Sequence, residues 1–141
     1  MSTTPSTLGP HVNIRTGKLD ANKAVEGGQY PFFTCAIHTS QIDSYSYDCE
    51  CVLVAGNGDL NVKYYNGKFD AYQRTYIIES KDKERLDTRY LFHFMSRYVE
   101  RLRTIAIGGV IKYIKLGYLT EAEIPIPDLA EQKRIAAILD K

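Results

Sequence analysis

The sequence has few cysteines, almost no net charge and no long apolar run, and each absence excludes a class of protein. Three cysteines among 141 residues, an odd number, argue against a framework of disulfide bonds and favour a reducing cytoplasm. No apolar run is long enough to span a bilayer, and the polar first residues lack the apolar core of a signal peptide. The formal net charge of +1 provides no overall attraction to nucleic acid or to a membrane surface. A nucleic-acid-binding protein with this balance must concentrate its basic residues locally.

The motifs of several enzyme classes are also missing. The sequence has no Walker loop, no Gly-x-Ser-x-Gly elbow, no His-Glu-x-x-His pair and no Asn/Asp-Pro-Pro-aromatic loop of a methyltransferase. A nuclease site could be assembled from Asp59 or Asp70 with Glu79 and Lys81, because carboxylates and a lysine can hold a divalent metal and activate water. A Glu-x-Lys pair also arises commonly where a strand meets a polar turn. We therefore predict a chain with no catalytic residues and no cofactor.

A zinc site is the other possibility to weigh. Cys35, His38, Cys49 and Cys51 supply four soft ligands within a short span, and zinc would require them in a tetrahedron. The Cys-x-Cys spacing is tighter than the usual Cys-x-x-Cys knuckle, and free cysteines are most often small core residues. We therefore predict that the chain holds no metal.

The length and the hydrophobic pattern predict one domain of the α+β class. Apolar and β-branched runs indicate strands at residues 12–15, 30–37, 51–55 and 72–79, with a turn at 56–59. Asn66 and Gly67 are the strongest short-range signal for a hairpin turn. Asp87 is placed to cap one long helix, with Leu86 and Leu91 as a hydrophobic staple. The apolar stripe predicted for this helix is Leu91, Phe94, Met95, Tyr98 and Leu102.

The most informative segment is the last one, residues 124–141. Pro125 and Pro127 favour extended backbone before them, and Asp128 with Glu131 forms the pattern of a capping box. The helix that follows carries an apolar stripe that needs a partner, formed by Leu129, Ile135, Ile138 and Leu139. We predict that this stripe packs on its own domain or on a second copy, because so short a helix is marginal alone.

Residues 124–135, IPIPDLAEQKRI, resemble the block that closes each target recognition domain in the DNA-specificity subunits of type I restriction–modification systems. Earlier blocks match in the same order. They are residues 28–33 (GQYPFF), 52–58 (VLVAGNG), 67–78 and 108–114. The chain is therefore identified as resembling one such domain, from about Leu8 to Lys141.

The resemblance implies a strand-rich α+β target recognition domain at residues 1–127 with one packed helix, followed at 128–141 by the start of a truncated spacer or dimerisation helix. It implies no covalent chemistry. Instead, the domain reads one half of a bipartite target in double-stranded DNA, while modification subunits that methylate adenine dock beside the spacer helices and restriction subunits join through the complex. The short spacer helix and the missing second recognition domain fit a half-subunit, an excised domain or a truncated product. Homodimerisation or pairing with a second recognition domain follows from this organisation, and the location is the cytoplasm.

Within this family framework, polar and aromatic side chains at turns and strand ends are the candidates for DNA contact. Gln and Arg can pair bidentately with adenine and guanine, lysines can meet phosphates, and tyrosines can pack on sugars or thymine methyls. The candidates are Asn57, Lys63, Tyr64, Tyr72, Gln73, Arg74, Lys112, Tyr113 and Lys115. Basic residues are also dense from Arg97 to Lys115, where only Glu100 opposes them. The alternative is a protein-interaction module of the same fold that does not read DNA.

Overall fold

The computed structural model describes residues 5–105 and 113–141. Its strands are β1 (Ser6–Thr7), β2 (Val12–Thr16), β3 (Tyr30–Phe33), β4 (Ser40–Ile42), β5 (Tyr47–Ala55), β6 (Val62–Ala71), β7 (Thr75–Ser80) and β8 (Glu123–Ile124). The helices are α1 (Thr88–Ile105), α2 (Leu116–Thr120) and α3 (Leu129–Leu139), with 3-10 turns η1 (Gly9–His11) and η2 (Ala21–Lys23). The α+β class predicted from the sequence is confirmed. Among the described helices, none combines the length and apolarity needed to cross a membrane.

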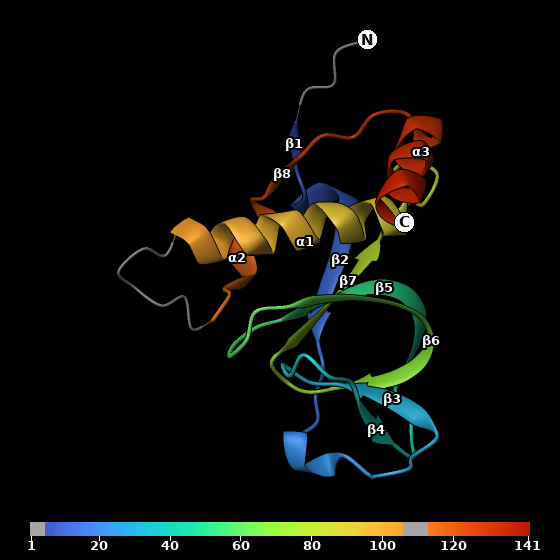
Figure 1. Ribbon diagram of the computed structural model, residues 1–141, viewed down its shortest axis with the longest axis vertical. Helices are drawn as coiled ribbons and strands as arrows, with labels where there is room; N and C mark the ends of the chain where they lie inside the picture. The colour runs from blue at the N-terminus through green and yellow to red at the C-terminus, as the bar shows by residue number, and fades with distance from the viewer. Residues whose placement is uncertain (1–4, 106–112) are drawn as a thin grey trace.

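Six strands form one sheet in the order β2-β7-β5-β6-β3-β4, and β1 pairs separately with β8. All neighbours are antiparallel except β3 and β6, which run parallel. The long strands β5 and β6 curve together toward β3, so that this part of the sheet wraps around its own core (Figure 1). Helix α1 lies across the opposite side of the sheet (Figure 1).

Alternation along β5 explains the two cores, because successive side chains of a strand face opposite sides of the sheet. Val52 and Val54 are fully buried against α1, in a cluster that includes Leu91 and Met95. The intervening residues face the inside of the curled sheet, in a cluster of Phe33, Tyr47, Cys51, Leu53, Phe69, Ala71 and Ile77. Because β5 is buried on both sides from Cys51 to Ala55, this part of its sequence is continuously apolar.

The hairpin predicted at Asn66 and Gly67 is wrong. Strand β6 runs through both residues without a break, and they pair with Glu50 and Cys49 of β5. Gly67 adopts φ +146, and a Cβ there would lie 3.2 Å from the Tyr65 hydroxyl oxygen, so glycine serves a bend rather than a turn. The Asn-Gly signal is local, whereas the long pairing with β5 is a tertiary interaction that overrides it.

The turn of the β5–β6 hairpin lies at residues 56–61, and a second turn at 72–74 connects β6 to β7, which lie on opposite sides of β5 in the sheet. The strand predicted at 72–79 therefore begins only at Thr75, whose N–H donates to the Tyr72 carbonyl across the turn at 2.9 Å. The strand predicted at 30–37 likewise ends early, at Phe33. Both corrections leave polar residues in loops at the same end of the sheet.

The local signals for the two main helices are correct. Asp87 accepts a hydrogen bond from the Tyr90 N–H at 3.0 Å and caps α1, while Leu86 and Leu91 are both buried as a staple requires. Asp128 caps α3 in the same way, accepting from the Glu131 N–H at 2.9 Å. The Glu131 carboxylate binds the Arg134 guanidinium at 2.6 Å.

Helix α3 packs against α1, and a buried glutamine joins it to the residues just before α1. The Gln132 side chain is fully buried and makes three hydrogen bonds to backbone groups. Its Oε1 accepts from the Asp87 N–H at 2.8 Å, and its Nε2 donates to the Arg85 and Pro127 carbonyls at 2.7 and 2.8 Å. The residues before α1 and after β8 are thus joined to α3 by one side chain. Leu129 and Ile135 are half-buried, whereas Ile138 is 56% exposed.

A cluster of charges attaches the end of α3 to α1. Asp140 accepts two hydrogen bonds from Arg89, from Nε at 3.0 Å and from Nη2 at 2.7 Å, and its Oδ1 lies 2.6 Å from His93 Nε2. These two partners, Arg89 first, lower the pKa of the Asp140 carboxyl to about 2. The carboxylate form of Asp140 is therefore favoured by the folded state.

Asp140→Asn should lower the free energy of unfolding at neutral pH, because it removes the anion that Arg89 and His93 contact. Since the pKa of Asp140 is depressed on folding, its contribution is present above the unfolded pKa near 4 and is lost as pH falls toward about 2. Urea unfolding at pH 7, 4 and 2.5 measures this. The difference in free energy of unfolding between wild type and Asp140→Asn should shrink as the pH falls. Asp43→Asn, at an exposed loop position, should show no such difference from wild type. A gap that persists at the lowest pH contradicts this role.

Candidate functional site

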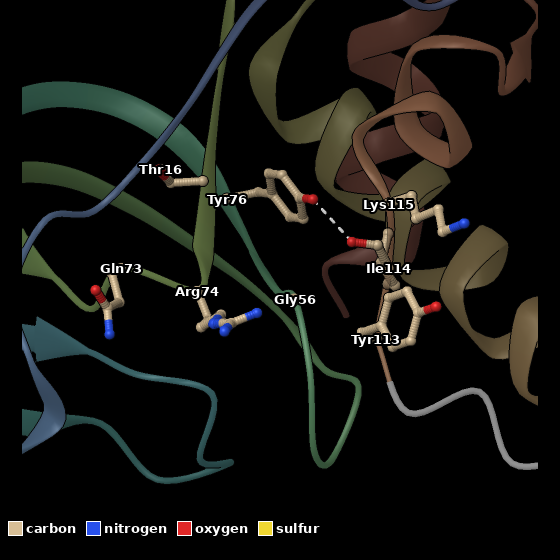
Figure 2. Close-up of a pocket in the computed structure, with 8 residues that line it drawn as sticks. All are labelled: Thr16, Gly56, Gln73, Arg74, Tyr76, Tyr113, Ile114 and Lys115. Carbon is tan, nitrogen blue, oxygen red and sulfur yellow. Dashed lines mark hydrogen bonds between the residues drawn. The ribbon is translucent and has the colours of Figure 1, made fainter.

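Three segments far apart in the sequence meet at the end of the sheet where β5 stops and β7 starts. The Gly56 N–H donates to the Arg74 carbonyl at 2.9 Å, and the Ile114 N–H donates to the Gly56 carbonyl at 2.7 Å. Asn57 and Tyr113 form a further antiparallel bridge. The Tyr76 hydroxyl then donates to the Ile114 carbonyl at 2.8 Å, which joins β7 to the same segment (Figure 2). Loop 56–61, turn 72–74 and segment 113–115 are therefore held together by backbone pairing.

Gly56 is required by this arrangement. A Cβ atom at this position would lie 2.3 Å from the Arg74 carbonyl oxygen and 3.3 Å from the Tyr76 ring. The first distance is far inside van der Waals contact, and the atom concerned belongs to the backbone. Only glycine lets turn 72–74 approach residue 56 this closely.

A hollow of about 460 Å³ opens between these segments. Figure 2 shows Gln73 and Arg74 on one side of it and Tyr113 with Lys115 on the other. The remaining lining residues are Thr16, Gly56, Tyr76 and Ile114, so none of the described residues that line the hollow carries a carboxylate. We refer to the eight residues together as the reading hollow.

The reading hollow is electropositive. Arg74 is exposed and forms no ion pair with any residue in the described part of the chain, and Lys115 is exposed as well. Lys115 Nζ lies 5.9 Å from the centroid of the Tyr113 ring, which is 54% exposed. Two cations, an amide and an aromatic ring face solvent together, a combination suited to a polar anionic ligand.

The structure brings together four of the residues predicted to contact DNA, Gln73, Arg74, Tyr113 and Lys115, and places Asn57 beside them. Lys112 lies outside the described residues. Tyr72 is half-buried behind the turn, and its N–H donates to the Phe33 carbonyl at 2.9 Å.

Tyr64 lies away from the reading hollow, on the face of the sheet that packs against α1. Its hydroxyl donates to the Glu50 carboxylate at 2.5 Å, and the Arg89 guanidinium lies 4.5 Å from its ring centroid. Burial, together with the Glu50 carboxylate, raises the pKa of Tyr64 to about 12. The side chain is engaged inside the protein. Tyr64 pairs with Val52 on β5, and Val52 faces α1. Paired residues lie on the same face of a sheet, so Tyr64 faces α1 as well.

Lys63 also makes internal contacts. Its Nζ donates to the Ala36 carbonyl at 2.7 Å and to Asn61 Oδ1 at 2.7 Å. Burial lowers the pKa of the Lys63 ammonium. The side chain attaches the start of β6 to the loop that follows β3.

The carboxylates and cysteines weighed from the sequence have other surroundings. Glu79 pairs with Arg15 at 2.9 Å, and the buried Asp70 accepts from the Ser46 hydroxyl at 2.8 Å. Cys49 and Cys51 lie on the same face of β5. Within residues 5–105 and 113–141, no group of three or more His, Cys, Asp or Glu side chains is arranged to hold a metal ion.

Sequence reasoning missed Thr16, Gly56, Tyr76 and Ile114 as parts of the site. The only local signal among them was Gly56, next to Asn57-Gly58, which indicated a turn but not a close approach of three segments. Thr16 and Tyr76 are ordinary strand residues in the sequence, and only the pairing of β2 with β7 brings them together.

Gly56→Ala should destabilise the fold by about 1 kcal/mol, the lower end expected when an atom is forced into packed surroundings, because the flanking loops can shift. Gly117→Ala is the matched control, since a Cβ there meets no atom closer than 3.8 Å in the short helix α2. Denaturant unfolding of both variants measures the difference. Equal stability of the two variants would show that residues 56 and 74 are not in close contact.

A second hollow of about 180 Å³ lies between α1 and α3 and is largely apolar. It is lined by Tyr90, His93, Phe94, Arg97, Pro125, Ile135 and Leu139. Ile138 is exposed next to it on α3. Two of the four residues predicted to contact another subunit, Ile135 and Leu139, therefore border this groove, and Leu129 is half-buried nearer the start of the helix.

Comparison with known proteins identifies relatives over nearly the whole chain. The model of the type I restriction modification DNA specificity domain matches residues 5–141. The type I restriction enzyme EcoDI specificity subunit of Escherichia coli is 44% identical over 133 residues, which cover 94% of this chain and 29% of the relative.

Two solved structures share the fold. The S subunit of a type I restriction-modification system from M. genitalium superimposes with a TM-score of 0.83 at 22% identity, covering 99% of this chain and 38% of that one. The HsdS subunit from Thermoanaerobacter tengcongensis gives a TM-score of 0.70 at 19% identity, covering 96% and 36%. The chain thus spans about a third of the length of these relatives.

Proposed function

This chain belongs to the family of type I restriction modification DNA specificity domains, and from that premise we propose that it reads one half of a bipartite target in double-stranded DNA. The observation that supports this most is the reading hollow, where Gln73 and Arg74 lie beside Tyr113 and Lys115 with no carboxylate among them. The domain binds and discriminates DNA without catalysing a reaction, and needs no cofactor.

The 72–74 turn is suited to the major groove because it projects two side chains that can make paired hydrogen bonds. Arg74 matches the O6 and N7 acceptors of guanine, and Gln73 matches the N6 and N7 groups of adenine. If Gln73 and Arg74 lay in a strand, they would face opposite sides of the sheet, and only one of them could point at the bases. Since both residues lie in a turn and are exposed, both can face the same groove. Lys115 supplies charge for a phosphate, which positions the domain without reading sequence.

The α1–α3 groove is a second surface with a different function. Residues 128–141 form the start of a spacer helix, and Leu129, Ile135, Ile138 and Leu139 serve contact with another subunit or a second recognition domain. The exposure of Ile138 beside an apolar groove supports this, because an apolar residue of that size gains by burial. The partners are the modification subunits, with restriction subunits joining through the complex, in the cytoplasm.

Selection from random duplexes tests the function. The chain is incubated with a duplex library, alone and with its modification subunit, and bound duplexes are sequenced. Enrichment of one short base sequence is expected. If no sequence is enriched in either condition while the chain still binds the modification subunit, the chain is a protein-interaction module of this fold.

Lys115→Ala should weaken binding to every duplex to a similar degree. If Lys115 neutralises one phosphate, the plot of log affinity against log salt should become less steep by about 0.9. Equilibrium binding to the selected duplex and to an unrelated duplex, each at several salt concentrations, measures this slope. A loss confined to the selected duplex would instead make Lys115 a base reader.

A further inference from the structure

The loop that follows β3 lies beside the 72–74 turn. Cys35 Sγ donates to the Arg74 carbonyl at 3.5 Å, and Thr34 Oγ1 accepts from the Ala36 N–H at 3.1 Å, which closes a local turn. The Thr75 hydroxyl donates to the Phe33 carbonyl at 3.2 Å just before the loop. Residues 34–38 therefore lie next to Arg74 although about 40 residues separate them in the sequence.

Two side chains hold this loop through its backbone, Asn61 just before β6 and Lys63 within it. Asn61 Nδ2 donates to the Cys35 carbonyl at 3.0 Å and to the Asp59 carbonyl at 2.7 Å. Lys63 Nζ donates to the next carbonyl, that of Ala36, at 2.7 Å, and to Asn61 Oδ1 at 2.7 Å. Consecutive carbonyls are thus fixed by two partners that also bind each other. Hydrogen bonds from a charged donor are the stronger kind, so the Lys63 contact makes the loop rigid.

Ile37 follows directly after these anchored carbonyls and is 57% exposed, the largest fraction among the exposed large apolar residues of the described chain. A branched apolar side chain that is exposed on a rigid loop contributes no buried apolar surface to the stability of the isolated domain. The apolar group that the major groove offers is the C5-methyl of thymine, and side chains of this kind contact it.

We propose that residues 34–38 form a second reading element, in which Ile37 contacts the C5-methyl of a thymine next to the bases read by Gln73 and Arg74. Lys63 and Asn61 are positioning residues that hold the loop for this contact, and Lys63 does not bind a phosphate. This inference rests on the proposed function, because it requires that the domain reads DNA.

Replacing each thymine of the selected duplex by deoxyuridine, one at a time, removes only the C5-methyl and tests the Ile37 contact. Wild type should lose about fourfold in affinity at one position, the effect of one buried methyl group. Ile37→Ala should bind the thymine duplex about fourfold more weakly and show no further loss with deoxyuridine at that position. Val25→Ala is the matched control, since Val25 is exposed outside both hollows, and it should keep the wild-type sensitivity. Equal deoxyuridine sensitivity of wild type and Ile37→Ala at every position overturns the contact.

Lys63→Met separates positioning from phosphate binding, because methionine keeps the unbranched chain but lacks the ammonium. The variant should lose sensitivity to the same thymine methyl while the salt dependence of binding stays as in wild type. Lys68→Met, at an exposed position on β6, should change neither. If Lys63→Met reduces the salt slope by about 0.9 and leaves the methyl sensitivity intact, Lys63 binds a phosphate and the positioning role is wrong.

The experiments distinguish a failure of the second reading element from a failure of the proposed function. If wild type selects a sequence that depends on Gln73 or Arg74 but shows no Ile37-dependent methyl effect, the second reading element is wrong and the proposed function stands. If wild type selects no sequence at all, the proposed function and the second reading element both fall.

Discussion

Gln132→Leu should lower the free energy of unfolding by about 3 kcal/mol, at roughly 1 kcal/mol for each of the three hydrogen bonds to backbone groups that it removes. The three groups are the Asp87 N–H and the carbonyls of Arg85 and Pro127. Leucine fills a similar volume, so the loss reports the hydrogen bonds rather than a cavity. The effect is large because Gln132 is completely buried, where water cannot replace the lost contacts.

The matched control is Gln73→Leu, the same substitution at an exposed turn position, which should change stability by less than about 0.5 kcal/mol. Urea unfolding of both variants and of wild type gives the comparison. If Gln132→Leu were as stable as Gln73→Leu, α3 would not be an integral part of the domain core. The division at residue 128 would then describe two separable pieces.

Arg74→Ala should weaken binding to the selected duplex by about 1–3 kcal/mol and remove the preference at one base pair. The substitution leaves the fold intact, because the turn is held by the Arg74 carbonyl, which accepts from the Gly56 N–H at 2.9 Å, and not by the guanidinium. Gln73→Ala should act in the same way at a neighbouring base pair.

Arg85→Ala is the control for Arg74→Ala, since Arg85 is exposed on the loop before α1, outside the reading hollow. It should reduce affinity slightly or not at all and leave base preference unchanged. The measurement is competition against single-base variants of the selected duplex. If Arg74→Ala and Gln73→Ala each keep the wild-type affinity and preference, the 72–74 turn is not the reading surface.

Local signals in the sequence predicted the parts of the fold that local interactions determine. Asp87 and Asp128 cap helices as predicted because a cap involves only neighbouring residues. The Asn66-Gly67 signal failed because β5 continues past it and keeps β6 extended. Gln132 gave no signal, since a glutamine on a short helix is usually solvated, and two of its three partners, at Arg85 and Asp87, are 47 and 45 residues away in the sequence.

The same difference between local signals and long-range contacts applies to the candidate site. No spacing in the sequence connects Arg74 with Lys115, and the two were predicted together only because the chain resembles a family. In the structure, hydrogen bonds at Gly56 bring their segments together. Lys63 and Tyr64 were candidates by residue type. Their internal partners, the Ala36 carbonyl and the Glu50 carboxylate, depend on loop packing and on which face of β6 each residue occupies.

Base discrimination is the central claim, and competition binding of the wild-type chain tests it most directly. The selected duplex is labelled, and each of its single-base variants competes for the chain at a fixed salt concentration. We expect a short block of positions where a mismatch costs about 1–3 kcal/mol, flanked by positions that cost almost nothing. Competitors that all displace the labelled duplex equally well would show that the chain binds DNA only through its charge, and would contradict the account.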